Sequence, residues 1–260
     1  MSLPQILAEG VFAKLPVLVN ADTCSGRTYI VTGGNHGLGL ETARHLVRSQ
    51  AARVILTVRN NKAGEEAKTD IERSTGRKGV IDLWHLDLAS FDSVKAFANK
   101  LSSEVERIDA FVANAGVQMD RWETAEGNEL SMTVNVISTV LLSVLIMPKL
   151  VEIAKKFNNS PKLVYTGSAL GFVAEKELAK SGETDIFKGL NDQKRADMDQ
   201  SHGRLLSGCK VKEYWVPKWM TDAAGRKLQK QIWSELVDMM EKEQPSCVSK
   251  LSSRIDGTSV

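Results

Sequence analysis

Between about residues 27 and 172, short apolar runs alternate with longer stretches whose apolar positions recur at helical spacing. The runs that we predict to be strands are, in chain order, TYIVTGG, RVILTVRN, VIDLWHLDL, IDAFVANAG and KLVYTGS. Strands that are separated by helices form βαβ units with parallel strands. We therefore expect an α/β fold with a doubly wound, mostly parallel, Rossmann-like sheet in a single domain.

The amphipathic stretches between these runs predict the helices that would cover the sheet. They read LETARHLVRSQ, NKAGEEAKTDIERSTG and SFDSVKAFANKLSSEV, the last opened by a serine N-cap. A fourth helix is expected over 130–155, and the segment 225–243 predicts a further amphipathic helix. The apolar face of that last helix carries Leu228, Ile232, Leu236 and Met239.

The pattern divides the chain into three parts. Residues 1–26 form an N-terminal extension, residues 27–243 form one domain, and the Ser-rich residues 244–260 are expected to be a flexible tail. The alternation weakens after about Gly171, and residues 172–210 are polar and loop-like, with helical hints only at AEKELAKS. The sequence therefore predicts the first half of the domain in more detail than the second.

Composition and charge exclude several classes of function. The chain has 260 residues, 42% of them hydrophobic and 25% charged, with a formal net charge of +2. Neither a nucleic-acid surface nor a membrane surface is expected from these values. The three cysteines, Cys24, Cys209 and Cys247, are widely spaced and show no metal-ligand pattern, so we interpret them as free thiols and expect no metal site.

Apolar segments also bear on the location of the protein. The runs VFAKLPVLV and VISTVLLSVLIM are too short to span a bilayer, and we interpret the second as a buried helix. The first residues lack the charged and apolar regions of a secretory signal. We therefore expect a soluble protein of the cytoplasm, without a membrane span.

The sequence TGGNHGLG, residues 32–39, links a predicted strand to a predicted helix. Gly33, Gly37 and Gly39 permit a close approach of the backbone to a pyrophosphate, where a Cβ atom would clash. The N-terminus of the following helix adds free N–H groups and the positive end of the helix dipole. A tight strand-to-helix turn would also explain these glycines, but the strand–loop–helix context favours a dinucleotide site.

The spacing Thr-Gly-x-x-x-Gly-x-Gly resembles the short-chain dehydrogenase/reductase family, and further motifs of that family follow in order. The matching motifs are LDL at 86–88, NAG at 114–116, VNVIST at 134–139 and VYTGSALGF at 164–172. The resemblance covers about Arg27 to Phe172. Within the family, the chain is most similar to fungal secondary-metabolism and retinol-dehydrogenase-like reductases.

This resemblance implies a set of residues that bind the cofactor. They are Gly33, Asn35, Gly37, Leu38 and Gly39 in the glycine loop, Asp87 at the adenine ring, and Asn114, Ala115 and Gly116 beside the cofactor.

Arg59 and Lys62 follow the second predicted strand, near the expected adenosine ribose. An acidic residue there would accept the 2′-hydroxyl of NAD, whereas a guanidinium can form two hydrogen bonds to the 2′-phosphate of NADP. Because no carboxylate occurs in this stretch before Glu65, NADP(H) is the expected cofactor. The alternative is that Arg59 is only a solvated residue at a strand end.

In the family that the chain resembles, a serine polarises the substrate carbonyl and an asparagine holds a water in a proton relay. Ser168 and Asn135 are the matching residues. A tyrosine supplies the proton there, and a lysine four residues later lowers the tyrosine pKa. Tyr214 and Lys218, in YWVPK, have this spacing, but they lie far beyond the serine and enclose Pro217, which opposes a helix. His202, nearer the expected position, is an alternative proton donor.

After about Gln200 the chain departs from the family, because the late strand and the Pro-Gly turn that close over the nicotinamide have no counterpart. A truncated chain, or a gene model that retains an intron or shifts frame, would produce this pattern. The first function that we consider is an NADP(H)-dependent oxidoreductase acting on a carbonyl or secondary alcohol in a fungal secondary-metabolite (polyketide) pathway. The second is a catalytically impaired dinucleotide-binding pseudoenzyme or regulatory module. A homodimer is the protein partner that the family suggests.

Overall fold

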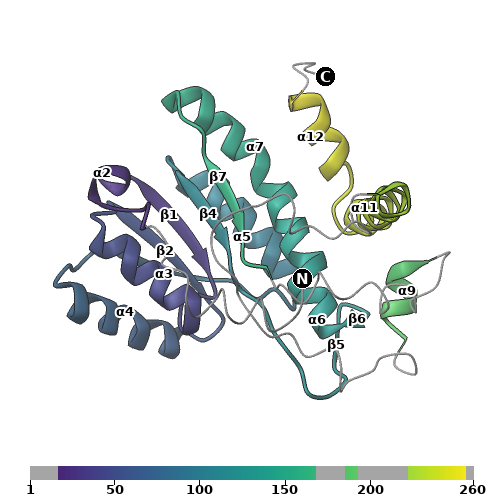
Figure 1. Cartoon of the computed structure of the whole chain (residues 1–260), viewed down its shortest axis with the longest axis horizontal. Helices are drawn as coiled ribbons and strands as arrows, with labels where there is room; N and C mark the ends of the chain where they lie inside the picture. The colour runs from purple at the N-terminus through teal and green to yellow at the C-terminus, as the bar shows by residue number, and fades with distance from the viewer. Residues whose placement is uncertain (1–16, 168–184, 193–221, 256–260) are drawn as a thin grey trace.

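The computed structural model of the chain describes residues 17–167, 185–192 and 222–255. Five parallel strands form its central sheet, in the order β3-β2-β1-β4-β7 (Figure 1). They are β1 (Thr28–Thr32), β2 (Arg53–Val58), β3 (Ile81–His85), β4 (Ala110–Ala113) and β7 (Lys162–Tyr165). The order reverses between β1 and β4, which confirms the doubly wound α/β fold that the alternating pattern predicted.

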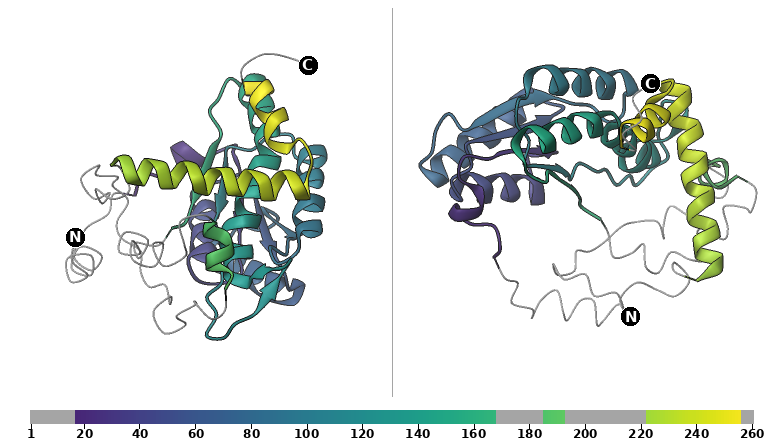
Figure 2. Two further views of the ribbon diagram at one scale, coloured as in Figure 1. Left: turned by 90° about the vertical axis from the view of Figure 1, so that its right-hand side faces the viewer. Right: turned by 90° about the horizontal axis from the view of Figure 1, so that it is seen from above.

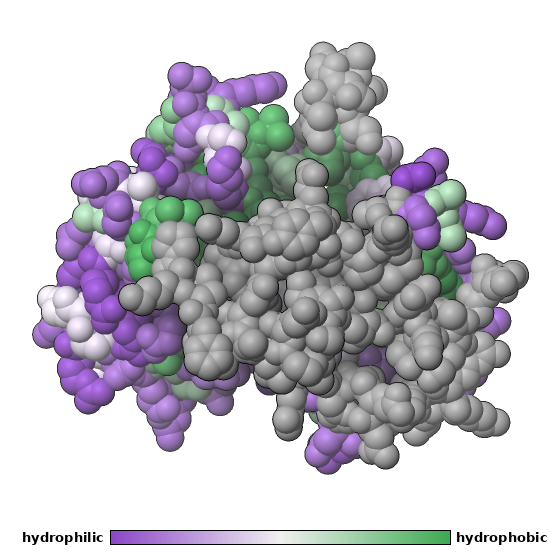
Figure 3. Space-filling model, viewed as in Figure 1, coloured by the Kyte–Doolittle hydropathy of each residue, from purple (hydrophilic) through white to green (hydrophobic). Residues whose placement is uncertain are grey.

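Helices cover both faces of the sheet. On one face lie α3 (Gly37–Arg48) and α4 (Asn61–Thr75), and on the other lie α5 (Phe91–Glu104) and α7 (Thr139–Phe157) (Figure 1). All five residues of β1 are buried, as expected for a strand with helices on both sides. Over α3 and α4 the surface is mostly hydrophilic (Figure 3), so these helices bury one apolar stripe and leave a polar face in water.

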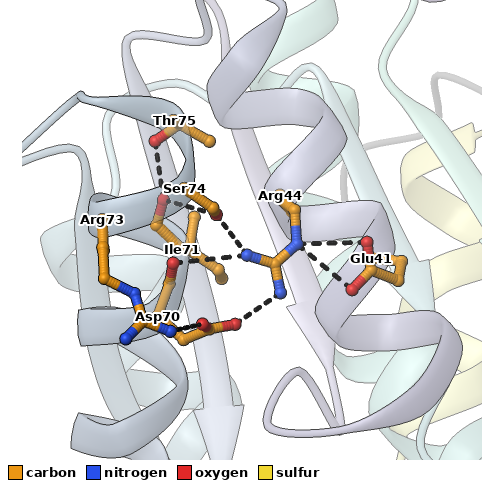
Figure 4. Close-up of polar contacts among 7 residues, drawn as sticks. All are labelled: Glu41, Arg44, Asp70, Ile71, Arg73, Ser74 and Thr75. Atoms are coloured by element: carbon orange, nitrogen blue, oxygen red, sulfur yellow. Dashed lines mark hydrogen bonds and ion pairs between the residues drawn. The ribbon is translucent and has the colours of Figure 1, made fainter.

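A polar cluster centred on Arg44 joins α3 to α4 (Figure 4). Arg44, whose side chain is only 11% exposed, donates from Nε to both carboxylate oxygens of Glu41 and from Nη2 to Oδ2 of Asp70, at 2.6 Å. It also donates to the hydroxyl of Ser74, while Arg73 binds the second oxygen of Asp70. The hydrogen bond from Arg44, and after it the one from Arg73, holds the pKa of Asp70 below its ordinary value.

One long helix covers the segment 130–155, which the sequence predicted to be helical. It consists of α6 (Leu130–Met132), the π-helical stretch η1 (Thr133–Ser138) and α7. Among the described residues, this helix, Leu130–Phe157, is long and apolar enough to cross a membrane by length and composition alone. Core helices of soluble proteins meet the same criterion, and here 56% of the most apolar window is buried. Since α7 also packs against α5 and α12, we describe it as a core helix.

The C-terminal helices agree with the sequence in one case and depart from it in two. The predicted helix 225–243 is confirmed as α11 (Ala223–Glu243). The segment predicted to be loop-like contains α9 (Ile186–Leu190), which packs against α11 (Figure 2). The segment expected in a flexible tail contains α12 (Cys247–Ile255), which packs against both α7 and α11.

The helix α12 is held by a side chain that the pattern did not reveal. The Glu241 carboxylate accepts the N–H groups of Ser246, of Val248 at 2.9 Å and of Ser249 at 3.2 Å, at the start of the helix. Burial works to raise the pKa of Glu241, but these hydrogen bonds bring it below its ordinary value. Val248 and Leu251 pack against the main apolar core. Tertiary contacts therefore stabilise α12, although its Ser-rich sequence does not predict a helix.

The end of the expected N-terminal extension also packs on the domain. The short helix α2 (Ala21–Cys24) buries Cys24 completely, and the Tyr29 hydroxyl lies 3.3 Å from its Sγ atom. The burial of the Tyr29 side chain, together with its contact with Cys24, raises the pKa of Tyr29. Cys24 and Cys247 are free thiols, as predicted, and Cys209 lies outside the described residues.

Candidate functional site

A cleft of about 350 Å³ opens at the carboxyl ends of the central strands. It lies where the strand order reverses between β1 and β4, which is where open α/β sheets bind their ligands. The glycine loop forms one wall through Gly33, Asn35, Gly37 and Leu38. Arg59 after β2, Asp87 after β3 and the segment 114–116 after β4 also line it. Motifs that are far apart in the sequence thus meet in one cleft.

The three glycines of the loop differ in what a Cβ atom would meet. At Gly33, where φ is +65°, it would lie 2.9 Å from the Cα atom of Ala115. At Gly39 it would overlap the carbonyl oxygen of Gly33 and lie 2.6 Å from Nδ2 of Asn114. At Gly37, where φ is +55°, it would meet no atom of the described residues within 4 Å. Gly33 and Gly39 therefore let the protein pack on itself, and Gly37 leaves open space where a ligand could approach.

The glycine loop leads into the N-terminus of α3. His36 is the N-cap residue, and its side chain makes no capping hydrogen bond. The first-turn N–H groups of a helix have no partner within the helix and carry the positive end of its dipole. Gly37 and Leu38, in this first turn, line the cleft, and the binding of an anion to their N–H groups stays a prediction.

A polar network ties the ends of three adjacent strands together beneath the cleft. The hydroxyl of Thr32, at the end of β1, accepts the N–H groups of Asn114 and Ala115, both at 2.9 Å. The Asn114 amide donates to the Thr32 carbonyl at 3.0 Å and accepts the hydroxyl of Thr166, after β7, at 3.3 Å. Thr32 is 1% exposed, so this network fixes the floor of the cleft.

Asn135 lies in the π-helical stretch η1, a rare geometry that is often found at functional sites. Its side chain binds the backbone of one residue, Val117: Oδ1 accepts the N–H and Nδ2 donates to the carbonyl, both at 2.8 Å. A Cβ atom at Gly116 would lie 3.1 Å from the same Oδ1 atom. The side chain therefore holds the segment that lines the cleft, and its expected role in a proton relay stays a prediction.

Arg59 and Lys62, both expected near the adenosine ribose, differ in their position relative to the cleft. Arg59 is exposed at the end of β2 and lines the cleft, and no hydrogen bond or ion pair links it to the other described residues. Lys62, in the first turn of α4, does not line this cleft and lies with Glu65 and Glu66 on the outer surface of the helix. Arg59 is therefore the better placed of the two for a 2′-phosphate.

Asp87 has a structural role in addition to its place in the cleft. Its Oδ1 atom accepts the N–H of Ala89 at 2.9 Å, and its own N–H donates to the hydroxyl of Ser93 in α5. These bonds fix the turn between β3 and α5. The second oxygen of the carboxylate has no protein partner among the described residues, and Asp87 is one of the residues that line the cleft.

Three of the expected catalytic residues, Ser168, Tyr214 and Lys218, lie outside the described residues, as does His202. Thr166, two positions before Ser168, lines the cleft. Sequence reasoning missed the cleft residues His36 and Thr166, although both occur within motifs that were recognised.

Comparison with known proteins adds to this geometry. The family model for short chain dehydrogenases matches residues 27–182. The chain is 42% identical over 174 residues to the short chain dehydrogenase/reductase dmxR8 of Cryptosporiopsis sp., covering 66% of this chain and 54% of that protein. It is 41% identical over 196 residues to the short chain dehydrogenase atnD of Emericella nidulans, covering 74% and 60%. The chain thus spans between half and two thirds of the length of these relatives.

Among solved structures, the chain resembles one described as a short-chain dehydrogenase from Novosphingobium aromaticivorans. The TM-score is 0.50 and the identity 23%, over 67% of this chain and 60% of the other. At this identity the likeness concerns the fold alone, and it agrees with the parallel sheet described above.

Proposed function

The chain belongs to the short-chain dehydrogenase/reductase family, and from this premise we propose that it is an NADP(H)-dependent oxidoreductase. Its reaction would transfer a hydride between the nicotinamide and a carbonyl or secondary-alcohol carbon. The observation that carries the proposal is the cleft at the strand switch point, which gathers the glycine loop, Asp87, Asn114 and Arg59, a guanidinium without a partner among the described residues. A location in the cytoplasm and a role in fungal secondary metabolism, such as a polyketide pathway, are proposed with it.

The residues of the cleft fit a dinucleotide in three respects. Gly37 leaves space next to uncapped N–H groups of α3, which suits a pyrophosphate. Arg59 offers a planar fork of donors for a 2′-phosphate. Asp87 offers a carboxylate oxygen at the proposed adenine end.

The bound nicotinamide would supply or accept the hydride, and the proton chemistry falls to this chain. In the proposed arrangement Ser168 polarises the substrate oxygen, and Tyr214 donates the proton with its pKa lowered by Lys218. Asn135 holds the segment 116–117 in place beside the reacting groups. Ser168 comes two positions after Thr166, which follows β7 and lines the cleft.

We test the cofactor proposal by titrating the purified chain with NADPH and, in parallel, with NADH, following nucleotide fluorescence. Saturable binding with a clear preference for NADPH is expected. Binding of neither nucleotide would contradict the proposal. Turnover is then measured with a panel of aldehydes and ketones.

Replacing Arg59 with alanine should weaken NADPH binding roughly tenfold or more, because a charged hydrogen-bonded contact with the 2′-phosphate is lost. Binding of NADH should stay within about twofold, since NADH lacks that phosphate. The matched variant Lys62→Ala removes a neighbouring cation that does not line the cleft, and should have a smaller effect. Equal losses for both nucleotides in Arg59→Ala would contradict the assigned role of the guanidinium.

A second candidate function is a nucleotide-binding module without catalysis. Pro217 lies between Tyr214 and Lys218, and a proline inside this spacing opposes the helix that would place both side chains on one face. The variant Tyr214→Phe separates the two functions. Loss of carbonyl reduction with NADPH affinity retained supports the enzyme with Tyr214 as its acid, whereas unchanged turnover removes Tyr214 from the mechanism. Absence of turnover in the wild type, with NADPH bound, favours the module.

A further inference from the structure

A two-residue turn precedes the long helix that carries Asn135. Glu126 and Gly127 form this turn between β5 (Thr124–Ala125) and β6 (Asn128–Glu129). Both have positive φ, 52° for Glu126 and 76° for Gly127, as a type I′ turn requires. Glycine adopts this conformation freely, whereas a glutamate is strained in it. A glutamate at this position therefore calls for a compensating contact.

The Glu126 carboxylate makes such a contact with a distant part of the chain. Its Oε1 atom accepts the N–H of Phe91 at 2.8 Å, across 35 positions of the sequence. Phe91 is the first residue of α5, and its N–H has no partner within the helix. The N-cap residue Ser90 accepts a different N–H, that of Ser93. The anionic side chain thus completes the cap and meets the positive end of the helix dipole.

The same turn of α5 fixes a wall of the cleft. The hydroxyl of Ser93 accepts the N–H of Asp87 at 2.9 Å, and Ser90 donates its N–H to the Asp87 carbonyl at 3.3 Å. Leu86, Asp87 and Leu88 all line the cleft. A contact that holds the N-terminus of α5 therefore also holds the wall to which the adenine end of the ligand is assigned.

The hairpin is also bound to the other end of the site. The hydroxyl of Thr133, which is fully buried in η1, donates to the carbonyl of Ala125 at 2.8 Å. Thr133 lies two residues before Asn135, whose amide holds Val117 beside the cleft. Adjacent residues of one hairpin, Ala125 and Glu126, thus contact η1 and the N-terminus of α5.

We propose that Glu126 is a positioning residue of this cleft, which sets the wall at Asp87 and links it through the hairpin to the π-helical stretch around Asn135. The inference rests on the proposed function, in that the ligand of the cleft is a dinucleotide. Filling the adenosine end should then stabilise η1 as well as the wall at Asp87, although Asn135 is not among the residues that line the cleft.

The test uses the full chain and two variants of Glu126. Glu126→Gly removes the carboxylate, which weakens the cap of α5, and also relieves the strain of positive φ. The two effects on stability oppose each other, so the melting temperature should stay close to the wild-type value. Glu126→Gln keeps the length and an acceptor oxygen but removes the charge. The control Glu123→Gln changes a carboxylate of the same segment whose one partner in the described part of the chain is Arg121, at the surface.

The probes are adenosine 2′,5′-bisphosphate, which fills the adenosine end alone, and hydrogen exchange of the backbone amides. Glu126→Gly should weaken binding of this probe roughly threefold to tenfold, the range given by the loss of a charged cap, with a melting temperature close to that of the wild type. Without ligand, amides of residues 87–93 and 133–138 should exchange faster than in the wild type. In the wild type the probe should slow exchange in both segments, and in Glu126→Gly only in the first.

The inference is overturned if both variants bind the probe as the wild type does, or if exchange in residues 133–138 is the same in Glu126→Gly and in the control. A variant that loses affinity only in proportion to lost stability would also overturn it. Failure of the wild type to bind either the probe or NADPH would contradict the proposed function instead, and the exchange of the ligand-free proteins would still decide the role of Glu126.

Discussion

Replacing Gly39 with alanine is expected to weaken NADPH binding by about 30-fold or more, the largest effect on binding that we expect from adding one methyl group. A Cβ atom at this position overlaps the carbonyl oxygen of Gly33 and lies 2.6 Å from Nδ2 of Asn114. The first of these is a backbone atom of a loop that is packed against Ala115, so it cannot move alone. The helix α3 must therefore shift away from the glycine loop, at a cost of about 2 kcal/mol, which corresponds to roughly 30-fold.

This shift would act on binding in two ways. It moves the uncapped N–H groups of α3 away from the proposed pyrophosphate, and it disturbs the bond from Asn114 to Thr32. The measurement is a fluorescence titration with NADPH, accompanied by thermal unfolding. Gly79→Ala is the control, because a Cβ atom at Gly79 would meet no described atom within 4 Å and Gly79 does not line the cleft. Gly79 has a φ of +72°, which Gly39 does not share, so the two variants are compared in NADPH binding and not in stability. If Gly39→Ala binds NADPH as tightly as this control does, the assigned packing role of Gly39 is wrong.

The parts of the site that could be predicted from sequence lie at strand ends. A continuous apolar run predicts a buried parallel strand, and parallel strands bring their carboxyl ends to the same edge of the sheet. Gly33, Asp87 and Asn114 directly follow or end such runs, so the fold alone gathers them into one cleft. The same reasoning assigned Lys62 to the cofactor site, whereas the structure places it on the outer surface of α4, because helical periodicity, and not the strand, decides where a side chain on α4 points.

The features that the sequence did not reveal depend on single side chains that bind distant backbone. Glu126 caps α5 from 35 positions away, and Glu241 caps α12, yet neither contact alters the period of the apolar pattern. Asn135 was assigned from its motif, but its two bonds to Val117 could not be inferred from spacing. Hydrogen bonds of this kind follow from the fold and do not produce it, so a pattern of apolar positions does not contain them.

Replacing Asp109 with alanine is expected to lower the free energy of unfolding by about 3 kcal/mol, the largest effect on stability that we expect away from the cleft. Asp109 directly precedes β4, and its side chain is 6% exposed. The carboxylate binds Arg107 through two hydrogen bonds of 2.8 Å and accepts the N–H of Thr28 at 2.9 Å. It also accepts the amide of Asn159 at 3.3 Å, so it joins the amino ends of β1 and β4 to the end of α7.

The loss in Asp109→Ala arises mainly from the groups left behind. The N–H of Thr28 is buried and would have no acceptor, whereas Arg107 is 36% exposed and can turn toward water, which limits its share. Asp82→Ala is the matched control, because Asp82 forms a single surface ion pair with Arg53, with the carboxylate 44% exposed, and should change stability by less than about 1 kcal/mol. Urea unfolding followed by circular dichroism measures both variants. Because Asp109 lies at the end of the sheet opposite the cleft, NADPH affinity measured under folded conditions should stay at the wild-type value. Equal losses of stability in Asp109→Ala and Asp82→Ala would show that the buried network adds nothing beyond a surface ion pair.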